Sequence, residues 1–193
     1  MFKYGAAIIA ATATAGPADY SQNGANWGET VALCKDGREQ SPINLFVEGA
    51  ETNGAMKLLG MSGYKDFELP SDMVEKSATK VQAMIPVESA GEFTLQLDDM
   101  TENVTFRNLQ FHFHAPSEHA VDNELYDLEV HFVHLYKDVS QDPDGDSLAA
   151  VIGVFFDRSA GTEDNEFLEE LWESKNGATD VDVQSFLDKV DFS

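Results

Sequence analysis

The sequence is poor in cysteine, in basic residues and in long apolar runs, and each scarcity narrows what the protein can be. Cys34 is the single cysteine, which indicates an intermolecular disulfide, a free thiol or an absent partner. Lys and Arg number 12 against 35 Asp and Glu, giving a formal charge of -23, so nucleic acid is not an expected partner. No apolar run approaches the roughly 20 residues of a membrane-spanning helix. The charge itself is explained by a solvated, soluble surface, with tolerance of high salt as the alternative.

The sequence does contain enough apolar residues to form a hydrophobic core. Apolar residues make up 42% of the 193 residues, and 13 residues are Phe, so we predict one globular domain over residues 16–193. Residues 1–15 are typical of an export signal, with Lys3, a short apolar stretch at 6–11 and the small residues 13–15. The alternative is a disordered N-terminal tail. We therefore expect a secreted, periplasmic or lumenal protein.

Hydrophobic patterning predicts a mainly β fold with peripheral α-helices. Residues 16–60 are rich in turn formers and indicate mostly loop with short extended pieces. Strands are predicted where apolar residues alternate or run together, at 81–87, 93–97, 104–114, 125–135 and 148–156. Helices are predicted at 162–175 and 183–190.

All five histidines fall between positions 112 and 134. Alternate side chains of a strand share a face, so Gln110, His112 and His114 are predicted on one face of the strand at 104–114. Glu129 and His131 share a face of the strand at 125–135. If the two strands pair antiparallel, three imidazoles converge without a fourth protein ligand, as in a catalytic zinc site with a position open to water.

A His-x-His pair alone is weak evidence, because surface strands often carry one. Leu109, Phe111 and Phe113 are predicted on the opposite face, and the two phenylalanines indicate that this face is buried. Gln110 stands two residues before His112, and Glu129 stands likewise to His131, so both are placed to hold the second nitrogen of a metal-bound imidazole.

Several ordered motifs resemble those of alpha-class carbonic anhydrases. They are Trp27, QSPI at 40–43, FHFH at 111–114, SEH at 117–119, EVHFVH at 129–134, the buried run 148–156 and FLEELW at 167–172. The similarity extends from about residue 20 to the end of the chain. The resemblance implies a central, mostly antiparallel twisted sheet.

The resemblance also implies residue roles. His112, His114 and His131 match the ligands of one Zn²⁺, Gln110 and Glu129 match the acceptors that hold those ligands, and His119 matches a buried histidine of the same network. Glu118 matches the acid that orients a zinc-bound hydroxide through a threonine, an ordinary loop carboxylate being the alternative. We interpret His134, on the other face of its strand, as structural.

Two features depart from the family. The region where members often carry a proton-shuttle histidine has none here, and its nearest titratable group is Glu92, so no proton shuttle is assigned. The sequence also lacks the Ser-Leu-Thr-Thr-Pro-Pro motif that supplies the threonine, and in many exported members a cysteine near it bonds the equivalent of Cys34. We therefore expect a chain truncated at its C-terminus relative to the family, or a naturally short variant. We expect residues 16–193 alone to hydrate carbon dioxide feebly or not at all.

The function implied is that of a carbonate dehydratase. Carbonic anhydrases are the standard case of zinc lowering the pKa of its bound water to about 7, and the hydroxide then attacks carbon dioxide to give bicarbonate and a proton. The alternative is a catalytically silent relative that keeps the zinc or the scaffold for binding or structure. The three intact ligands favour the enzyme. The sequence leaves the oligomeric state open.

Overall fold

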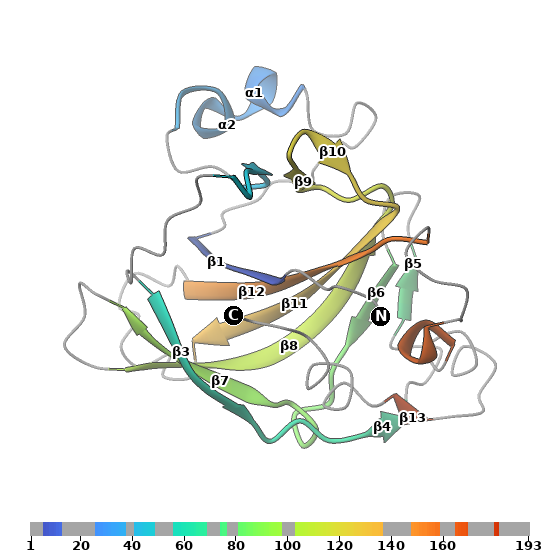
Figure 1. Ribbon diagram of the computed structural model, residues 1–193. Coiled ribbons are helices and arrows are strands. Elements are labelled where there is room, and N and C mark those ends of the chain that lie inside the picture. The colour runs from blue at the N-terminus through green and yellow to red at the C-terminus, as the bar shows by residue number, and fades with distance from the viewer. Residues whose placement is uncertain are drawn as a thin grey trace.

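A curved antiparallel sheet dominates the computed structural model (Figure 1). The structure describes residues 6–12, 26–37, 41–48, 56–68, 74–76, 81–97, 103–136, 148–158, 165–169 and 180–181. The strands of the large sheet are β1 (Ala6–Thr12), β3 (Met56–Ser62), β5 (Val74–Lys76), β6 (Val81–Met84), β7 (Glu92–Leu97), β8 (Val104–His114), β11 (Leu128–Tyr136) and β12 (Leu148–Phe156). The mainly β class and the antiparallel sheet predicted from the sequence are confirmed.

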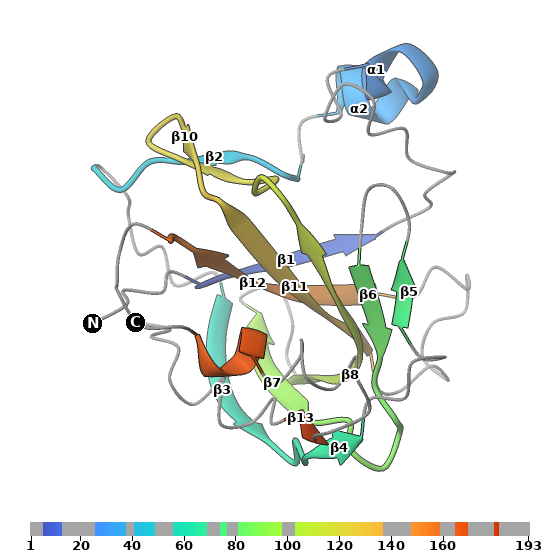
Figure 2. The ribbon, with the colours of Figure 1, turned by 90° about the vertical axis from the view of Figure 1, so that its right-hand side faces the viewer.

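The sheet is ordered β1-β12-β11-β8-β6-β5, and β7 pairs with both β3 and β8. Every pairing in it is antiparallel. Strands β8 and β11 lie side by side near its centre, and the sheet curls around them, as the second view shows (Figure 2). This central position holds the two strands that carry the histidines.

The remaining elements are short. They are the helices α1 (Trp27–Thr30) and α2 (Ala32–Asp36) and the strands β2 (Asn44–Leu45), β4 (Phe67–Glu68), β9 (Ala120–Val121), β10 (Glu124–Leu125) and β13 (Asp180–Val181). Within 165–169, residues 166–169 are helical, in the middle of the helix predicted at 162–175. The helix predicted at 183–190 lies outside the described residues. No helix among the described residues is long and apolar enough to span a membrane.

Three segments differ from the sequence prediction. Trp27 begins a short helix within the region expected to be loop, and β3 forms at the end of that region. Residues 6–12, expected within an export signal, form strand β1, which pairs antiparallel with β12 from Ala6↔Val154 to Thr12↔Leu148. Short-range patterning missed β1 because its partner lies far along the chain. The export signal itself stays a prediction.

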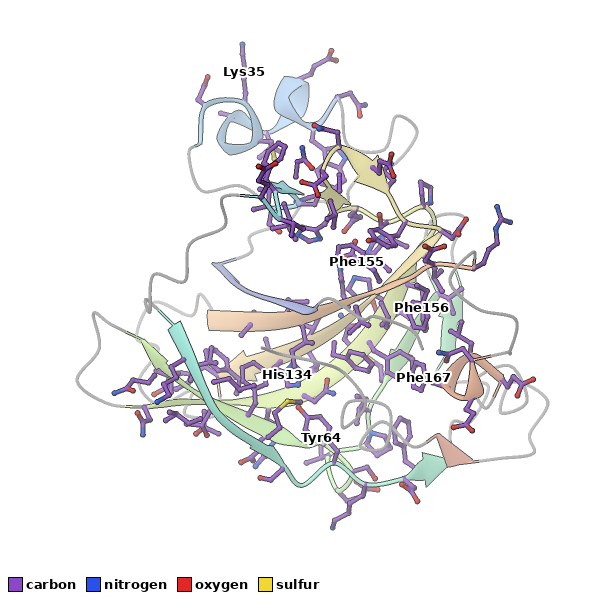
Figure 3. The ribbon with its side chains drawn as sticks, in the orientation of Figure 1. Lys35, Tyr64, His134, Phe155, Phe156 and Phe167 are labelled. Atoms are coloured by element: carbon purple, nitrogen blue, oxygen red, sulfur yellow. The ribbon has the colours of Figure 1, made fainter. Side chains whose placement is uncertain are left out.

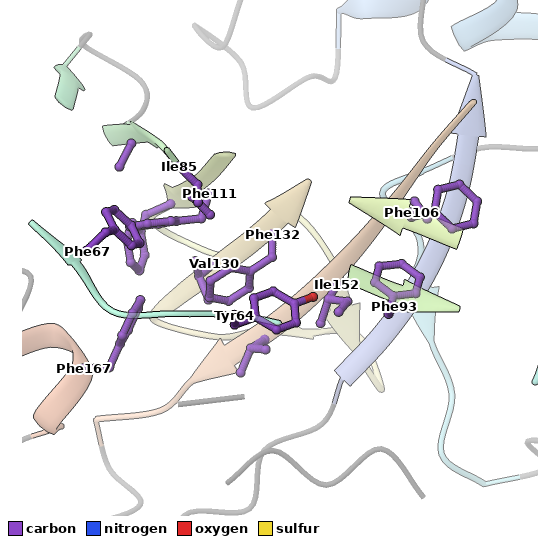
Figure 4. Packing of buried hydrophobic residues seen from close by; sticks show 14 of the residues in the cluster. Tyr64, Phe67, Ile85, Phe93, Phe106, Phe111, Val130, Phe132, Ile152 and Phe167 are labelled. Atoms are coloured by element: carbon purple, nitrogen blue, oxygen red, sulfur yellow. The ribbon is translucent and has the colours of Figure 1, made fainter. Parts of the chain in front are cut away.

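The hydrophobic core lies on one side of the β8–β11 pair. Figure 4 shows aromatic and branched side chains from several strands meeting there, with Phe167 from the helical segment 166–169 packed against them. Phe111 contacts Phe132 across the strand pair and also Phe167, with ring centroids 5.7 and 5.9 Å apart. This packing fixes the two strands against the rest of the molecule, and so fixes the side chains on their other face.

Candidate metal centre

The register of β8 and β11 brings the histidines of the two strands together. His131 pairs directly with His112, and Glu129 pairs with His114. Directly opposite residues of an antiparallel pair project from the same face, so the side chains meet above one patch of sheet. The antiparallel juxtaposition predicted from the sequence is confirmed.

A β-bulge at Leu109 decides which residues of β8 face the core. Val133 pairs with Gln110 and His134 with Asn108, so Leu109 is the extra residue. Before the bulge the buried apolar side chains of β8 are even-numbered, as at Phe106, and after it the buried apolar side chains are odd-numbered, as at Phe111. Without the bulge, His112 and His114 would share a face with Phe106. The bulge therefore turns the histidines out of the core, as bulges often do beside functional sites.

Leu109 itself does not follow the sequence prediction. Strict alternation placed it with Phe111 and Phe113, but its side chain is 36% exposed. The extra residue of a bulge is unpaired and follows neither face, so period-two counting fails at this position.

The three rings of His112, His114 and His131 form a compact cluster. Their centroids are 4.8 Å apart for His112 and His114, 5.1 Å for His112 and His131, and 5.0 Å for His114 and His131. One nitrogen from each ring lies within 4.8 Å of the other two. His114 and His131 are buried and His112 is half-buried, which leaves an approach for a small ligand.

Hydrogen bonds determine which nitrogen of two rings is left for a metal. Gln110 Oε1 lies 2.9 Å from His112 Nδ1, and Glu129 Oε1 lies 2.8 Å from His131 Nε2. Both oxygens only accept, so these nitrogens carry the protons and donate. His112 Nε2 and His131 Nδ1 are then the nitrogens that carry a lone pair. Zinc ligands are held by partners of this kind.

The carboxylate of Glu129 is the centre of this network. Its side chain is only 1% exposed. Oε1 accepts hydrogen bonds from His119 Nδ1 at 2.7 Å and His131 Nε2 at 2.8 Å, and Oε2 accepts from the backbone N–H groups of Glu118 and His119 at 2.9 and 3.0 Å. Burial alone would raise the pKa of Glu129, but the hydrogen bonds from His119 and His131 outweigh it and hold that pKa well below its usual value. Glu129 is therefore a fixed, ionised acceptor.

His119 is held from its other side by Ser41. Ser41 Oγ lies 3.1 Å from His119 Nε2. The parallel pairing of β2 with β9, beginning at Asn44↔Ala120, carries the segment after Ser41 alongside the segment after His119. The QSPI motif at 40–43 thus reaches the histidine network, a contact that the sequence resemblance alone did not reveal.

A second group, His119, Glu129 and His131, also has three ligand-type atoms within 4.8 Å of one another. Its atoms lie 2.7 and 2.8 Å apart, which is hydrogen-bonding distance. Ligands about 2.0–2.1 Å from a tetrahedral zinc stand about 3.3 Å from each other, so this group is a hydrogen-bond network rather than a ligand set. The cluster His112, His114 and His131 fits Zn²⁺ better because it offers one nitrogen from each of three imidazoles, a donor set found in catalytic zinc sites.

Glu118 faces the same cluster. Its Oε2 lies 3.3 Å from His114 Nε2 and 3.8 Å from His131 Nδ1, and its side chain is mostly buried. The structure therefore brings together all seven residues proposed for the site: Gln110, His112, His114, Glu118, His119, Glu129 and His131.

His134 lies apart from this cluster, in the core, as its place in the sequence predicted. Figure 3 shows it beside Tyr64. Tyr64 Oη donates to His134 Nε2 at 2.7 Å, and His134 Nδ1 donates to the carbonyl of Phe132 at 2.9 Å.

Burial lowers the pKa of His134 to about 3, although the backbone carbonyls of Phe132 and Ala150 act in the opposite direction. Burial, and secondarily the charge of Glu92, raises the pKa of Tyr64. Tyr64 was missed because nothing in its local sequence indicates a partner 70 residues away.

Glu92 is engaged in an ion pair. Its Oε1 accepts from Arg107 Nε at 3.0 Å and Arg107 Nη2 at 2.8 Å, across the β7–β8 pairing. We therefore assign Glu92 no role in proton transfer. Cys34 is exposed on α2.

Comparison with known proteins identifies the family to which the chain is similar. The family model described as eukaryotic-type carbonic anhydrase matches residues 22–191. A carbonic anhydrase of Nostoc sp. is 32% identical over 165 residues, which cover 82% of this chain and 54% of that protein. One of Pectobacterium carotovorum is 33% identical over 159 residues, covering 80% and 54%. The chain thus spans about half the length of the curated relatives it matches.

A solved structure agrees with the fold. The halotolerant carbonic anhydrase from Dunaliella salina aligns with a TM-score of 0.65 at 21% identity, over 90% of this chain and 72% of that one. At that sequence identity the structural similarity supports the fold assignment alone.

Proposed function

This chain belongs to the eukaryotic-type carbonic anhydrase family, and from that premise we propose that it is a zinc-dependent carbonate dehydratase. The reaction is the reversible hydration of carbon dioxide to bicarbonate and a proton. The observation that carries the proposal is the convergence of His112, His114 and His131 on one face of paired strands, supported by acceptor side chains.

The zinc would be held by His112 Nε2, His131 Nδ1 and one nitrogen of His114. When bound, it would supply a Lewis acid that lowers the pKa of water to about 7, so that hydroxide is available near neutrality. Three imidazoles leave a fourth position for that water. The ligand atoms span up to 4.8 Å, so shifts of under about 1 Å would bring all three to zinc-bonding distance.

Gln110 and Glu129 hold two of the ligands. By accepting the Nδ1 proton of His112 and the Nε2 proton of His131, they fix each ring's tautomer and its orientation. Ionised Glu129 also increases the basicity of His131. His119 and the backbone N–H groups of residues 118 and 119 fix the carboxylate in turn.

Glu118 is the proposed carboxylate that orients the reacting water. Its Oε2 lies beside the ligand nitrogens of His114 and His131, where it can accept a hydrogen bond from the reacting water and hold one lone pair toward the substrate. We assign no proton shuttle.

The experiment is stopped-flow hydration of carbon dioxide, comparing zinc-loaded protein, chelator-treated protein and the zinc-treated His112→Ala variant. A rate that depends on zinc and is lost in His112→Ala supports the proposal, however slow that rate is. One bound zinc with no zinc-dependent rate would favour the silent relative. A rate unaffected by the chelator and by the variant would reject zinc catalysis.

We also propose that the chain is exported and that residues 1–15 are removed, leaving one domain over 16–193. The sequence pattern of residues 3–15 supports this. Removal would also delete β1 and uncover β12, whose backbone it pairs with. N-terminal sequencing of the protein secreted from its own cells tests the cleavage.

A further inference from the structure

We infer that Gly153 is a positioning residue of the metal centre: the absence of a side chain there makes the space in which Glu129 holds His131. This inference rests on the proposed zinc site and assigns a further residue to it. Gly153 has no side chain with which to bind the metal or to hydrogen-bond to the site. Its effect is transmitted through the Glu129 carboxylate.

The sheet register places Gly153 directly beneath the network. Gly153 lies on β12 opposite His131 on β11, so a side chain there would project from the same face as His131. A methyl group at this position would lie 3.0 Å from Glu129 Oε1, 3.6 Å from His131 Cδ2 and 3.8 Å from His131 Nε2. The contact with Oε1 is closer than an ordinary carbon–oxygen contact, whereas the two with His131 are normal.

The carboxylate cannot move aside without cost. Oε1 is the acceptor for both His119 Nδ1 and His131 Nε2, at 2.7 and 2.8 Å, and Oε2 is held by two backbone N–H groups. A shift of a few tenths of an ångström in Oε1 must therefore lengthen at least one of these bonds or rotate the His131 ring. That ring carries the proposed zinc ligand Nδ1.

Backbone conformation gives no other reason for glycine here. Gly63 is the glycine with positive φ among the described residues, so Gly153 has a conformation open to any residue. Glycine weakens a strand interior, and in a strand it often marks a close approach by another group. Gly153 interrupts a run of larger apolar residues, Val151 to Phe156, in β12. The close approach of Glu129 accounts for it.

The test compares Gly153→Ala with Gly60→Ala. Gly60 is also in a strand of the large sheet, but a methyl group there would meet nothing within 4 Å. Zinc affinity is measured by competition with a chromophoric chelator, and the imidazole ¹⁵N shifts of His119 and His131 are recorded by NMR in the metal-free proteins. We expect Gly153→Ala to weaken zinc binding by about 10- to 100-fold, the usual effect of disturbing a ligand's support. It should also shift the His131 nitrogen resonances, and Gly60→Ala should change neither.

A second pair of variants assigns the effect to the carboxylate. In a Glu129→Ala background the methyl group has nothing to displace, so adding Gly153→Ala should cause no further loss of zinc affinity. Equal affinity and unchanged shifts in Gly153→Ala and wild type would overturn the inference, and so would an equal penalty in both backgrounds.

Two other outcomes remain decisive. If Gly153→Ala fails to fold, folding of the Glu129→Ala/Gly153→Ala double variant supports the inference and its failure overturns it. If wild type binds no zinc, the proposed function fails, and the metal-free shifts alone decide the role of Gly153.

Discussion

Strands β8 and β11 present histidines on one face and phenylalanines on the other, although both faces arise from the same backbone. On the histidine face, acceptor side chains fix the rings of His112 and His131, and the ring of His114 lies beside both. On the phenylalanine face, Phe111 and Phe132 pack in the core. Packing on the core face makes the two strands rigid, and this rigidity holds the histidine ligands of the other face in place. The ligands themselves need not stabilise the fold.

The comparison also shows how little separates the two faces in sequence. His134 is a histidine on the phenylalanine face, 0% exposed and hydrogen-bonded to Tyr64, only three residues after His131. Position relative to the alternation and the bulge decides whether a histidine belongs to the site or to the core. Variants that affect one face and spare the other therefore test this division.

The largest effect is expected on the histidine face. His131→Ala removes one of three ligands and should weaken zinc binding on the order of 1000-fold. In free energy this loss is about a third of the roughly 10–16 kcal/mol with which structural sites bind zinc. His134→Gln, a change of a buried histidine on the other face, should keep zinc affinity close to wild type in the folded protein. Chelator competition measures both. Equal losses in the two variants would remove the distinction between the faces.

Breaking the phenylalanine face should act on stability instead. Phe132 is fully buried between Phe111 and Phe167, and Phe132→Ala should lower the free energy of unfolding of the metal-free protein by about 3–5 kcal/mol. Phe46→Ala is the matched control, because Phe46 is 57% exposed and its loss should cost little. Urea unfolding measures both. A small effect of Phe132→Ala would mean that the core face does not hold the strands.

A smaller effect is expected from the support of a single ligand. Gln110→Ala leaves His112 in place but removes the acceptor for its Nδ1 proton, so zinc affinity should fall about 10-fold. Gln96→Ala, at an exposed position of β7, should have no effect. If the two variants bind zinc equally, Gln110 does not orient the ligand.

The last prediction distinguishes the faces by their response to pH. Burial lowers the pKa of His134 from about 6.5 in the unfolded chain to about 3 in the folded protein, so between these values the unfolded chain holds more protons. Stability should therefore fall as the pH is lowered through this window, by up to about 1.4 kcal/mol per pH unit from this group. Urea unfolding of metal-free protein at about pH 7 and about pH 5 should show a shallower dependence in His134→Gln than in wild type. An identical dependence would contradict a buried, neutral His134.

Sequence patterning recovered the parts of the structure that depend on local periodicity. The bounds of β8 and β12 are those predicted, because both stretches have the length of a strand and are rich in the β-branched and aromatic residues that favour one. The face shared by Gln110, His112 and His114 followed from counting by two, since no bulge interrupts residues 110–114.

What the sequence did not reveal depends on contacts between distant segments. The bulge at Leu109 is defined by pairing with β11, and Tyr64 and Ser41 reach their histidines from 70 and 78 residues away. Strand β1 exists through its pairing with β12. Gly153 left a signal, as a glycine within an apolar strand, but its meaning required knowing which carboxylate lies above it.

The central claim, that the histidine face is a zinc site, is tested most directly by a crystal structure of the zinc-loaded protein with anomalous diffraction at the zinc edge. We predict one zinc per chain, about 2.0–2.1 Å from His112 Nε2, His131 Nδ1 and a nitrogen of His114. Glu129 should keep its hydrogen bond to His131 Nε2 and should not coordinate the metal. Zinc bound by His119 and Glu129, or no ordered zinc near the three histidines, would contradict the account.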